Sequence, residues 1–210
     1  MVTSASVQRV GLFGGSFNPV HFGHLISARS VAEQLGLSQV VLIPAASPPH
    51  KQPAGLISAE HRLEMTRLAV RGDPLFTVSD VELRRAGPSY TFDTVTSLQQ
   101  ALGEAVKLSW IIGADSLAEL PTWYRIHDLI ARVDIVTVMR PGPWAEPAAI
   151  LQANFGAAET ARLLGSRLST PNIEISATDI RERVARGASI RYLTPAPVIA
   201  YIDEHGLYRG

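Results

Sequence analysis

Two histidines follow a glycine-rich stretch near the start of the chain. Residues 14–24 read GGSFNPVHFGH and come directly after an apolar run that ends at Phe13. Two successive glycines at the end of a strand let backbone amides approach a phosphate closely, and the N-terminus of a following helix adds N–H donors and partial positive charge. His21 and His24 are three residues apart, so on the first turn of a helix both rings project to the same side. The pattern indicates a site for phosphate groups.

Other interpretations of this stretch stay open. It lacks the GxGxxG fingerprint of dinucleotide-binding proteins, and it is not a Walker A loop because His50 precedes Lys51 and Val106 precedes Lys107. The two histidines could also cap a helix or bind a metal ion. A metal site is the weaker alternative, because no HExxH occurs and no third ligand lies at a recognisable spacing.

Further polar residues lie where other strands end or helices begin. Lys51 lies in a proline-stiffened loop, Gly113 and Asp115 follow an apolar run, and Arg140 stands at the end of another. Ser176, Thr178 and Arg181 stand at or near the start of a late helix. For each group an ordinary structural role competes: a solvated lysine, a helix cap at Asp115 or Ser176, or a surface arginine.

The periodicity of apolar residues predicts alternating strands and helices. Buried strands are predicted at residues 7–13, 39–43, 76–82, 107–112, 134–139 and 172–175. Helices are predicted from about residue 25 to 35, and at 58–70, 91–102, 124–133, 148–164, 178–186 and 195–205, with Ser58 and Thr91 as candidate caps and Gly36, Gly187 and Gly206 as stop signals.

Alternation of this kind predicts an α/β fold, a doubly wound, Rossmann-like parallel sheet with helices on both faces. Ligands of such sheets bind outside the carboxyl ends of the strands, where the strand order reverses. The polar residues named above therefore lie in the expected place for a site. Since the chain has no repeat or Gly/Ser linker, residues 1–210 are expected to form a single domain, with a C-terminal helical part from about residue 176.

The composition excludes several classes of protein. Nineteen basic residues balance nineteen acidic ones among 210, so a general nucleic-acid or membrane-surface binder is not expected. Cysteine is absent, which excludes disulfides, thiol chemistry and cysteine-based metal sites. There is no signal-peptide pattern and no apolar run of about 18 residues, so the chain is expected to be cytoplasmic.

Two motifs carry a resemblance to a known superfamily. HFGH at residues 21–24 resembles the HxGH signature of the nucleotidyltransferases, and ISATDIR at 175–181 is similar to their ISSTxIR motif, with Ala177 in place of a serine. Between them, PPHK at 48–51, GPSYTFDTV at 87–95 and IGADSLAELPTW at 112–123 resemble the bacterial nicotinate-nucleotide adenylyltransferases. The resemblance extends from about residue 10 to 208.

The resemblance implies an enzyme that transfers AMP from ATP to nicotinate mononucleotide, a step of NAD biosynthesis, with Mg²⁺ bound to the ATP. It implies catalytic roles for His21, His24 and Arg181. The ATP site implied by the resemblance comprises Gly14, Gly15, Ser16, Phe17, Gly23, Lys51, Gly113, Asp115, Arg140, Ser176 and Thr178. The implied site for nicotinate mononucleotide comprises Ser16, Lys51, Thr91, Trp123 and Tyr124, with the Trp123 indole stacked on the pyridine ring. No metal ligand from a protein side chain is expected, and a homodimer is a candidate assembly.

Two alternatives remain at this point. The acceptor could be nicotinamide mononucleotide or another phosphorylated compound. A non-catalytic nucleotide sensor on the same fold is the other alternative, although such a protein would be expected to have lost His24 or Arg181, and both are present.

Overall fold

A parallel β-sheet forms the centre of the computed structural model, which describes residues 7–47, 55–139 and 147–209. Its strands follow the order β3-β2-β1-β4-β5-β6, and all five neighbouring pairs are parallel. The strands are β1 (Arg9–Gly15), β2 (Gln39–Pro44), β3 (Phe76–Val78), β4 (Lys107–Gly113), β5 (Asp134–Met139) and β6 (Arg167–Ser169).

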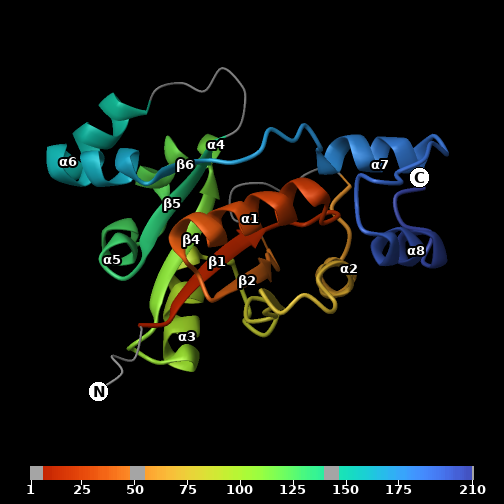
Figure 1. Ribbon diagram of the computed structural model, residues 1–210, viewed down its shortest axis with the longest axis horizontal. Helices are drawn as coiled ribbons and strands as arrows, with labels where there is room; N and C mark the ends of the chain where they lie inside the picture. Colours follow the sequence, from red (N-terminus) through yellow and green to blue (C-terminus); the bar gives the residue numbers. More distant parts are fainter. Residues whose placement is uncertain (1–6, 48–54, 140–146, 210) are drawn as a thin grey trace.

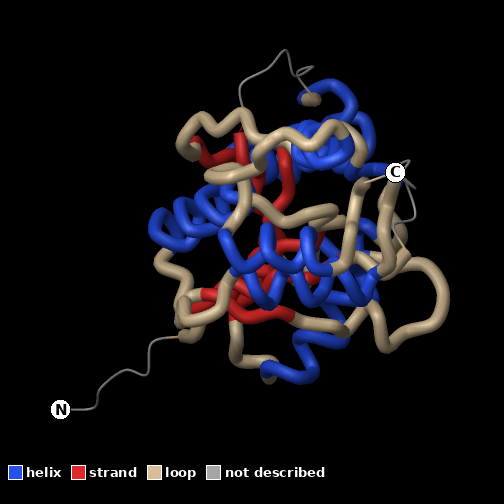
Figure 2. The backbone as a smooth tube through the Cα atoms, turned by 90° about the vertical axis from the view of Figure 1, so that its right-hand side faces the viewer, coloured by secondary structure: helices blue, strands red, loops and turns tan. Residues whose placement is uncertain are grey.

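Helices cover both faces of this sheet, as the two views show (Figures 1 and 2). They are α1 (Phe22–Leu35), α2 (Ala59–Ala69), α3 (Thr91–Leu102), α4 (Ala114–Leu117), the 3₁₀ turn η1 (Leu120–Thr122), α5 (Ile126–Ile130), α6 (Ala148–Gly165), α7 (Ala177–Ala185) and α8 (Ala196–Glu204). The predicted doubly wound parallel fold is thereby confirmed. None of these helices in the described ranges is long and apolar enough to cross a membrane.

Alternate residues of each strand face opposite sides and build two hydrophobic layers. One layer joins strand residues such as Phe13 and Ile111 to the buried sides of α1, α2, α7 and α8. The other joins Leu12 and Trp110 to α3, α4, α5 and α6. The strands are therefore apolar on both faces, which explains why they are near-continuous hydrophobic runs in the sequence.

The strand order reverses between β1 and β4. From β1 the chain adds β2 and β3 on one side, and it then crosses back to add β4, β5 and β6 on the other. The loops that follow β1 and β4 therefore separate at the carboxyl ends of these strands, leaving room for a ligand between them. The glycine loop at residues 14–16 and the segment around Gly113 both border this space.

Three expected elements differ from the structure. The strand predicted at 172–175 is wrong: the edge strand is Arg167–Ser169, paired with β5, and residues 172–175 carry the chain from β6 to α7 (Figure 1). The alternating isoleucines misled the prediction because Ile175 packs against the core without a strand partner. The strand predicted at 76–82 ends at Val78, and the helix predicted at 124–133 is confined to Ile126–Ile130.

Candidate active site

The histidine pair lies at the first turn of α1. The helix begins at Phe22, three residues before the expected start, so His21 is its N-cap and His24 lies in its first turn. The two rings stack with centroids 3.7 Å apart. The His21 backbone N–H donates to Nδ1 of His24 over 3.2 Å. Because Nδ1 accepts this hydrogen bond, the proton of a neutral His24 ring lies on Nε2, which makes Nε2 a donor for an anion.

Gly23 allows the histidine pair to pack closely against the second motif, ISATDIR at residues 175–181. A Cβ atom built on Gly23 would lie 3.0 Å from Nδ1 of His21 and 3.5 Å from the carbonyl oxygen of Ile175. The absence of a side chain thus lets the α1 start, the His21 ring and the segment before α7 pack together. The two motifs, about 150 residues apart in the sequence, are in contact here.

The glycine loop packs tightly against aromatic rings. A Cβ atom on Gly14 would lie 2.7 Å from the Trp110 indole, and one on Gly15 would lie 3.2 Å from the Phe17 ring. Phe17 itself has a φ of 44° and is 1% exposed. Its ring packs into the hydrophobic core beneath the loop, next to Phe13. The side chain of Phe17 therefore does not face a ligand, and only its main chain is left for the expected ATP contact.

Arg181 reaches the same loop from α7. It donates from Nη1 to the carbonyl oxygen of Asn18 over 2.9 Å and from Nη2 to Oγ1 of Thr178 over 3.2 Å. Ser176 is the N-cap of this helix, and its Oγ accepts from the backbone N–H of Asp179. The structural role of Ser176 as a cap is thus present, and its hydroxyl proton remains for a ligand.

Arg62 is a residue that the sequence analysis missed. Its side chain is 1% exposed and donates to three carbonyl oxygens: Ile57 at 3.1 Å, Ser16 at 2.8 Å and Ala46 at 3.4 Å. Among the described residues no carboxylate forms an ion pair with it. Burial lowers the pKa of the Arg62 guanidinium. The loops after β1 and β2 are therefore joined by a buried cation.

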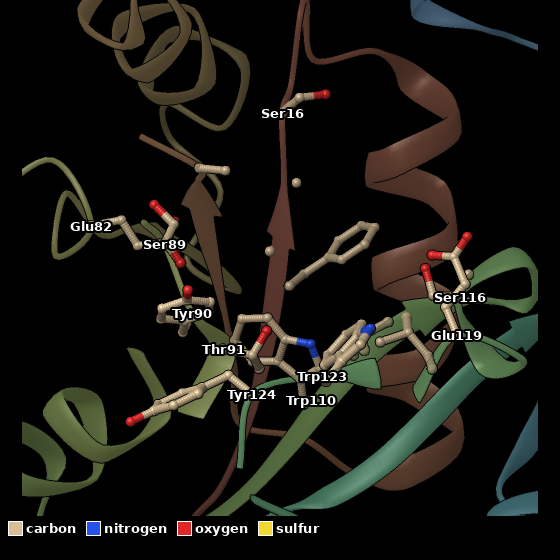
Figure 3. A pocket seen from close by; sticks show the side chains of 17 residues that line it. Ser16, Glu82, Ser89, Tyr90, Thr91, Trp110, Ser116, Glu119, Trp123 and Tyr124 are labelled. Carbon is tan, nitrogen blue, oxygen red and sulfur yellow. The ribbon is translucent and has the colours of Figure 1, made fainter. Parts of the chain in front are cut away.

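A cavity of about 310 Å³ opens beside the glycine loop, at the carboxyl ends of β1 and β4. Figure 3 shows Thr91, Trp110, Trp123 and Tyr124 gathered in one part of it and Glu82 and Ser89 in another. Trp110, which is 4% exposed, was not expected in the site. The cavity thus combines backbone at the strand ends with an aromatic lining, as small-molecule sites commonly do.

The first turn of α3 is fixed by a buried polar network. Thr91 is the first residue of this helix rather than its cap, because the extended Tyr90 occupies the cap position. Oγ1 of Thr94 donates to Glu82 over 2.8 Å and accepts from Arg85 over 3.0 Å. These contacts tie the segment before α3 to the helix. They set the position of the Thr91 amide at the cavity.

The Tyr124 ring, 47% exposed, lies 4.6 Å from the Tyr90 ring, measured between centroids. The next residue, Arg125, has a φ of 52° and places its guanidinium 4.1 Å from the Phe92 ring centroid. The turn that carries Trp123 and Tyr124 is thus held against α3 by aromatic and cation–π contacts.

The expected site residues fall into two neighbouring groups. The cavity is lined by Gly14, Gly15, Ser16, Thr91, Gly113, Trp123 and Tyr124. The second group surrounds the starts of α1 and α7 and comprises His21, Gly23, His24, Ser176, Thr178 and Arg181. Asp115 is exposed in α4, folds back over Gly113 and does not line the cavity.

Two expected site residues, Lys51 and Arg140, lie outside the described residues, as does His50 of the PPHK motif. Among the described ones, no group of three or more His, Cys, Asp or Glu could hold a metal ion. Asn18, Arg62, Trp110 and Tyr208 were not expected in the site. Of these four, Arg62 could have been recognised as buried from the sequence, because it shares a helix face with Met65 and Thr66, which are also buried.

Known proteins resemble this chain over nearly its whole length. Residues 12–183 match the family described as cytidylyltransferase-like. A relative from Thermomicrobium roseum is 42% identical over 97% of this chain and 92% of its own length, and one from Bordetella petrii is 47% identical over 97% and 100%. Both carry the name "probable nicotinate-nucleotide adenylyltransferase".

Solved structures show the same fold. The nicotinic acid mononucleotide adenylyltransferase of Plasmodium falciparum in complex with NaAD superposes with a TM-score of 0.74 at 16% identity, covering 96% of this chain and 97% of that one. The same enzyme in complex with APC gives a TM-score of 0.70 at 15% identity, over 96% and 97%.

Proposed function

We propose a reaction and residue roles for this chain from one premise: it belongs to the nicotinate-nucleotide adenylyltransferases, within the cytidylyltransferase-like family. The chain is an enzyme that transfers AMP from ATP to nicotinate mononucleotide. A phosphate oxygen of the mononucleotide bonds to the α-phosphorus of ATP, the bond from this phosphorus to the β-phosphate oxygen breaks, and pyrophosphate leaves. The product is nicotinate adenine dinucleotide.

One observation in the structure supports this reaction above others. An aromatic cavity for the acceptor and a cluster of phosphate-binding groups meet at the loop formed by residues 14–18. A phosphate monoester has a second pKa of about 6 and is mostly dianionic at neutral pH, so the nucleophile needs no general base. The protein's task is to hold two polyanions together and to stabilise the charge on the phosphoryl oxygens.

On the ATP side, His21, His24 and Arg181 are assigned to the phosphates. Because Nδ1 of His24 accepts the His21 N–H, a neutral His24 ring carries its proton on Nε2, the atom that we assign to a phosphate oxygen. Of the five N–H donors of Arg181, two are used within the described chain, so three remain for phosphate oxygens. The proposed ATP site is completed by the backbone of the glycine loop and by Gly113, Asp115, Ser176 and Thr178. Lys51 is retained because it belongs to the PPHK motif, and Arg140 because it follows the apolar run that ends at residue 139.

On the acceptor side, we assign the pyridine ring to Trp123 by stacking, and the nicotinate carboxylate to the backbone amides of Thr91 and Tyr124. Two features support the assignment: both residues line the same cavity as Trp123, and Thr91 begins α3, where N–H groups lack helical partners. Lys51 and the Ser16 loop are assigned to the acceptor phosphate. An adenylyltransferase for nicotinamide mononucleotide is the second candidate, because it differs only in the groups that meet the ring substituent.

A divalent cation is expected for an enzyme of this family, and we propose Mg²⁺. This ion is usually bound through substrate phosphates and water rather than by a cage of protein ligands. When bound, it would neutralise charge on the ATP phosphates. We also propose a single domain, whose part from about residue 176 supplies Ser176, Thr178 and Arg181, and a cytoplasmic location; a homodimer stays a prediction.

Incubating the purified protein with ATP, Mg²⁺ and each mononucleotide tests the proposal, with pyrophosphate and dinucleotide measured as products. We expect both products with nicotinate mononucleotide. The His24→Ala protein is the internal control, and we expect its turnover to fall by about 10²- to 10³-fold, as when one charge-stabilising donor is lost. No product with either acceptor would overturn the proposal, and product with nicotinamide mononucleotide alone would favour the second candidate.

A further inference from the structure

A chain of hydrogen bonds joins the end of the sequence to Arg181. Tyr208, which follows α8, donates its hydroxyl proton to Oδ1 of Asn18 over 2.9 Å. The carbonyl oxygen of the same Asn18 accepts the hydrogen bond from Nη1 of Arg181 over 2.9 Å. A single residue of the phosphate loop therefore connects Tyr208 with the cation assigned to the ATP phosphates.

Asn18 is held firmly enough to transmit an orientation. It is 1% exposed, and its side-chain amide donates to the carbonyl oxygen of Gly55 over 3.0 Å. Its Oδ1 also receives the backbone N–H of Ile57, although at 3.5 Å this contact is long. The Tyr208 hydroxyl supplies the shorter of the two hydrogen bonds at Oδ1, so its removal would leave this oxygen with one weak partner.

The hydrogen bond from Arg181 to Thr178 does not by itself fix the orientation of the Arg181 guanidinium. Its two acceptors, the Asn18 carbonyl and the Thr178 hydroxyl, are neutral, and no carboxylate pairs with it within the described ranges. Thr178 is exposed and lies on the same helix as Arg181, so it moves with α7. The carbonyl oxygen of Asn18 is therefore the acceptor that holds the guanidinium in place relative to the loop between Gly15 and α1.

We propose that Tyr208 is a positioning residue: by holding the Asn18 side chain, it fixes the Asn18 carbonyl and thereby the orientation of Arg181 toward the reacting phosphates. The inference rests on the proposed function, because it assigns to Tyr208 a role in that reaction. It predicts that losing the hydroxyl group slows turnover more than it weakens binding of the acceptor, which lies on the aromatic side of the loop.

The change Tyr208→Phe removes the hydroxyl and keeps the ring. Tyr201→Phe is a matched control, since Tyr201 lies on α8 and its hydroxyl forms its 2.9 Å hydrogen bond with Nδ1 of His61 rather than with Asn18. We expect Tyr208→Phe to lower kcat by about three- to tenfold, the value of one hydrogen bond, and to leave the KM for nicotinate mononucleotide within about twofold. Tyr201→Phe should leave kcat unchanged while losing similar stability in urea.

A double-mutant cycle separates action through Arg181 from a general structural effect. In the Arg181→Ala background, Tyr208→Phe should change kcat no further, because residues acting as one unit are not additive. Equal kcat values for Tyr208→Phe and Tyr201→Phe, or additive effects in the cycle, would overturn the inference and leave the proposed function standing. A wild-type protein that forms no product with either mononucleotide would overturn the function itself, and this inference with it.

Discussion

Replacing Gly23 by alanine should separate activity from stability. The new Cβ atom would lie 3.0 Å from Nδ1 and 3.1 Å from Cε1 of His21, which is closer than nearly all such contacts, so the His21 ring must move by a few tenths of an ångström. The Ile175 carbonyl, at 3.5 Å, is at ordinary contact distance and need not move. The displacement therefore falls on the ring that stacks on His24 with centroids 3.7 Å apart.

The expected effect on catalysis follows from this displacement. A misplacement of about 1 Å in an active site can cost about 10²-fold in rate, so a shift of a few tenths should lower kcat by about three- to tenfold. Stability should change little. Alanine is favoured over glycine inside a helix by up to about 1 kcal/mol, and this gain offsets a crowding cost of about 1 kcal/mol at the His21 ring.

The assay compares pyrophosphate release at saturating substrates with urea denaturation of the same samples. Gly165→Ala is the matched control, because Gly165 ends α6 and a Cβ atom there would have no neighbour within 4 Å. We expect the control to retain its kcat and to be equally or more stable. If Gly23→Ala turned over within about twofold of the wild type, the reasoning that the His21 ring position limits catalysis would be refuted.

Three other predictions concern the acceptor pocket and the pH dependence of stability. Trp123→Ala should weaken nicotinate mononucleotide by the loss of a stack, about 1 to 3 kcal/mol, and leave ATP affinity nearly unchanged; titrations with each ligand separately test this, and an equal loss for ATP would contradict it. The wild type should prefer nicotinate over nicotinamide mononucleotide by at least about tenfold in kcat/KM, because the nicotinamide NH₂ would point a donor at the Thr91 and Tyr124 amides; equal specificity constants would refute this pocket. Burial raises the pKa of Tyr208 above the ordinary value of 10.0, so its stabilising contribution is present below that pH and is lost as the pH rises toward the folded-state pKa. The urea midpoint of the wild type should therefore fall more steeply between about pH 9 and pH 11 than that of Tyr208→Phe, and parallel curves would contradict this.

The parts of the site that sequence reasoning could predict are those carried by local spacing. The separation of His21 and His24 predicts two rings on one side of a helix, and the structure stacks them. The helix start at Thr91 and the cap at Ser176 are likewise local features. Each follows from residues within one turn of one another, where backbone geometry leaves few arrangements.

The parts that could not be predicted depend on contacts between distant residues. Arg62 meets Ser16 from 46 residues away, and Tyr208 meets Asn18 from 190 residues away. The helix face that Arg62 shares with Met65 and Thr66 indicates that it is buried but not which loop it meets, and nothing in the local sequence distinguishes Tyr208 from an ordinary core tyrosine. Edge strand β6 was missed for a related reason: it has only three residues, and its pairing with β5 rather than its own pattern makes it a strand.

The sheet's division into two hydrophobic layers has a consequence for how this protein can change over evolution or in the laboratory. The aromatic turn with Trp123 and Tyr124 rests on the layer of α3, α4, α5 and α6, whereas the supports of the histidines and Arg181 belong to the layer of α1, α2, α7 and α8. The two layers lie on opposite faces of the sheet, and the loop after β1 leads from the aromatic cavity to the histidine pair at the start of α1. Substitutions that repack the layer of α3, α4, α5 and α6 can therefore reshape the acceptor pocket while the residues that bind the phosphates keep their positions. Directed libraries aimed at new acceptors are therefore best placed in α3 and α5.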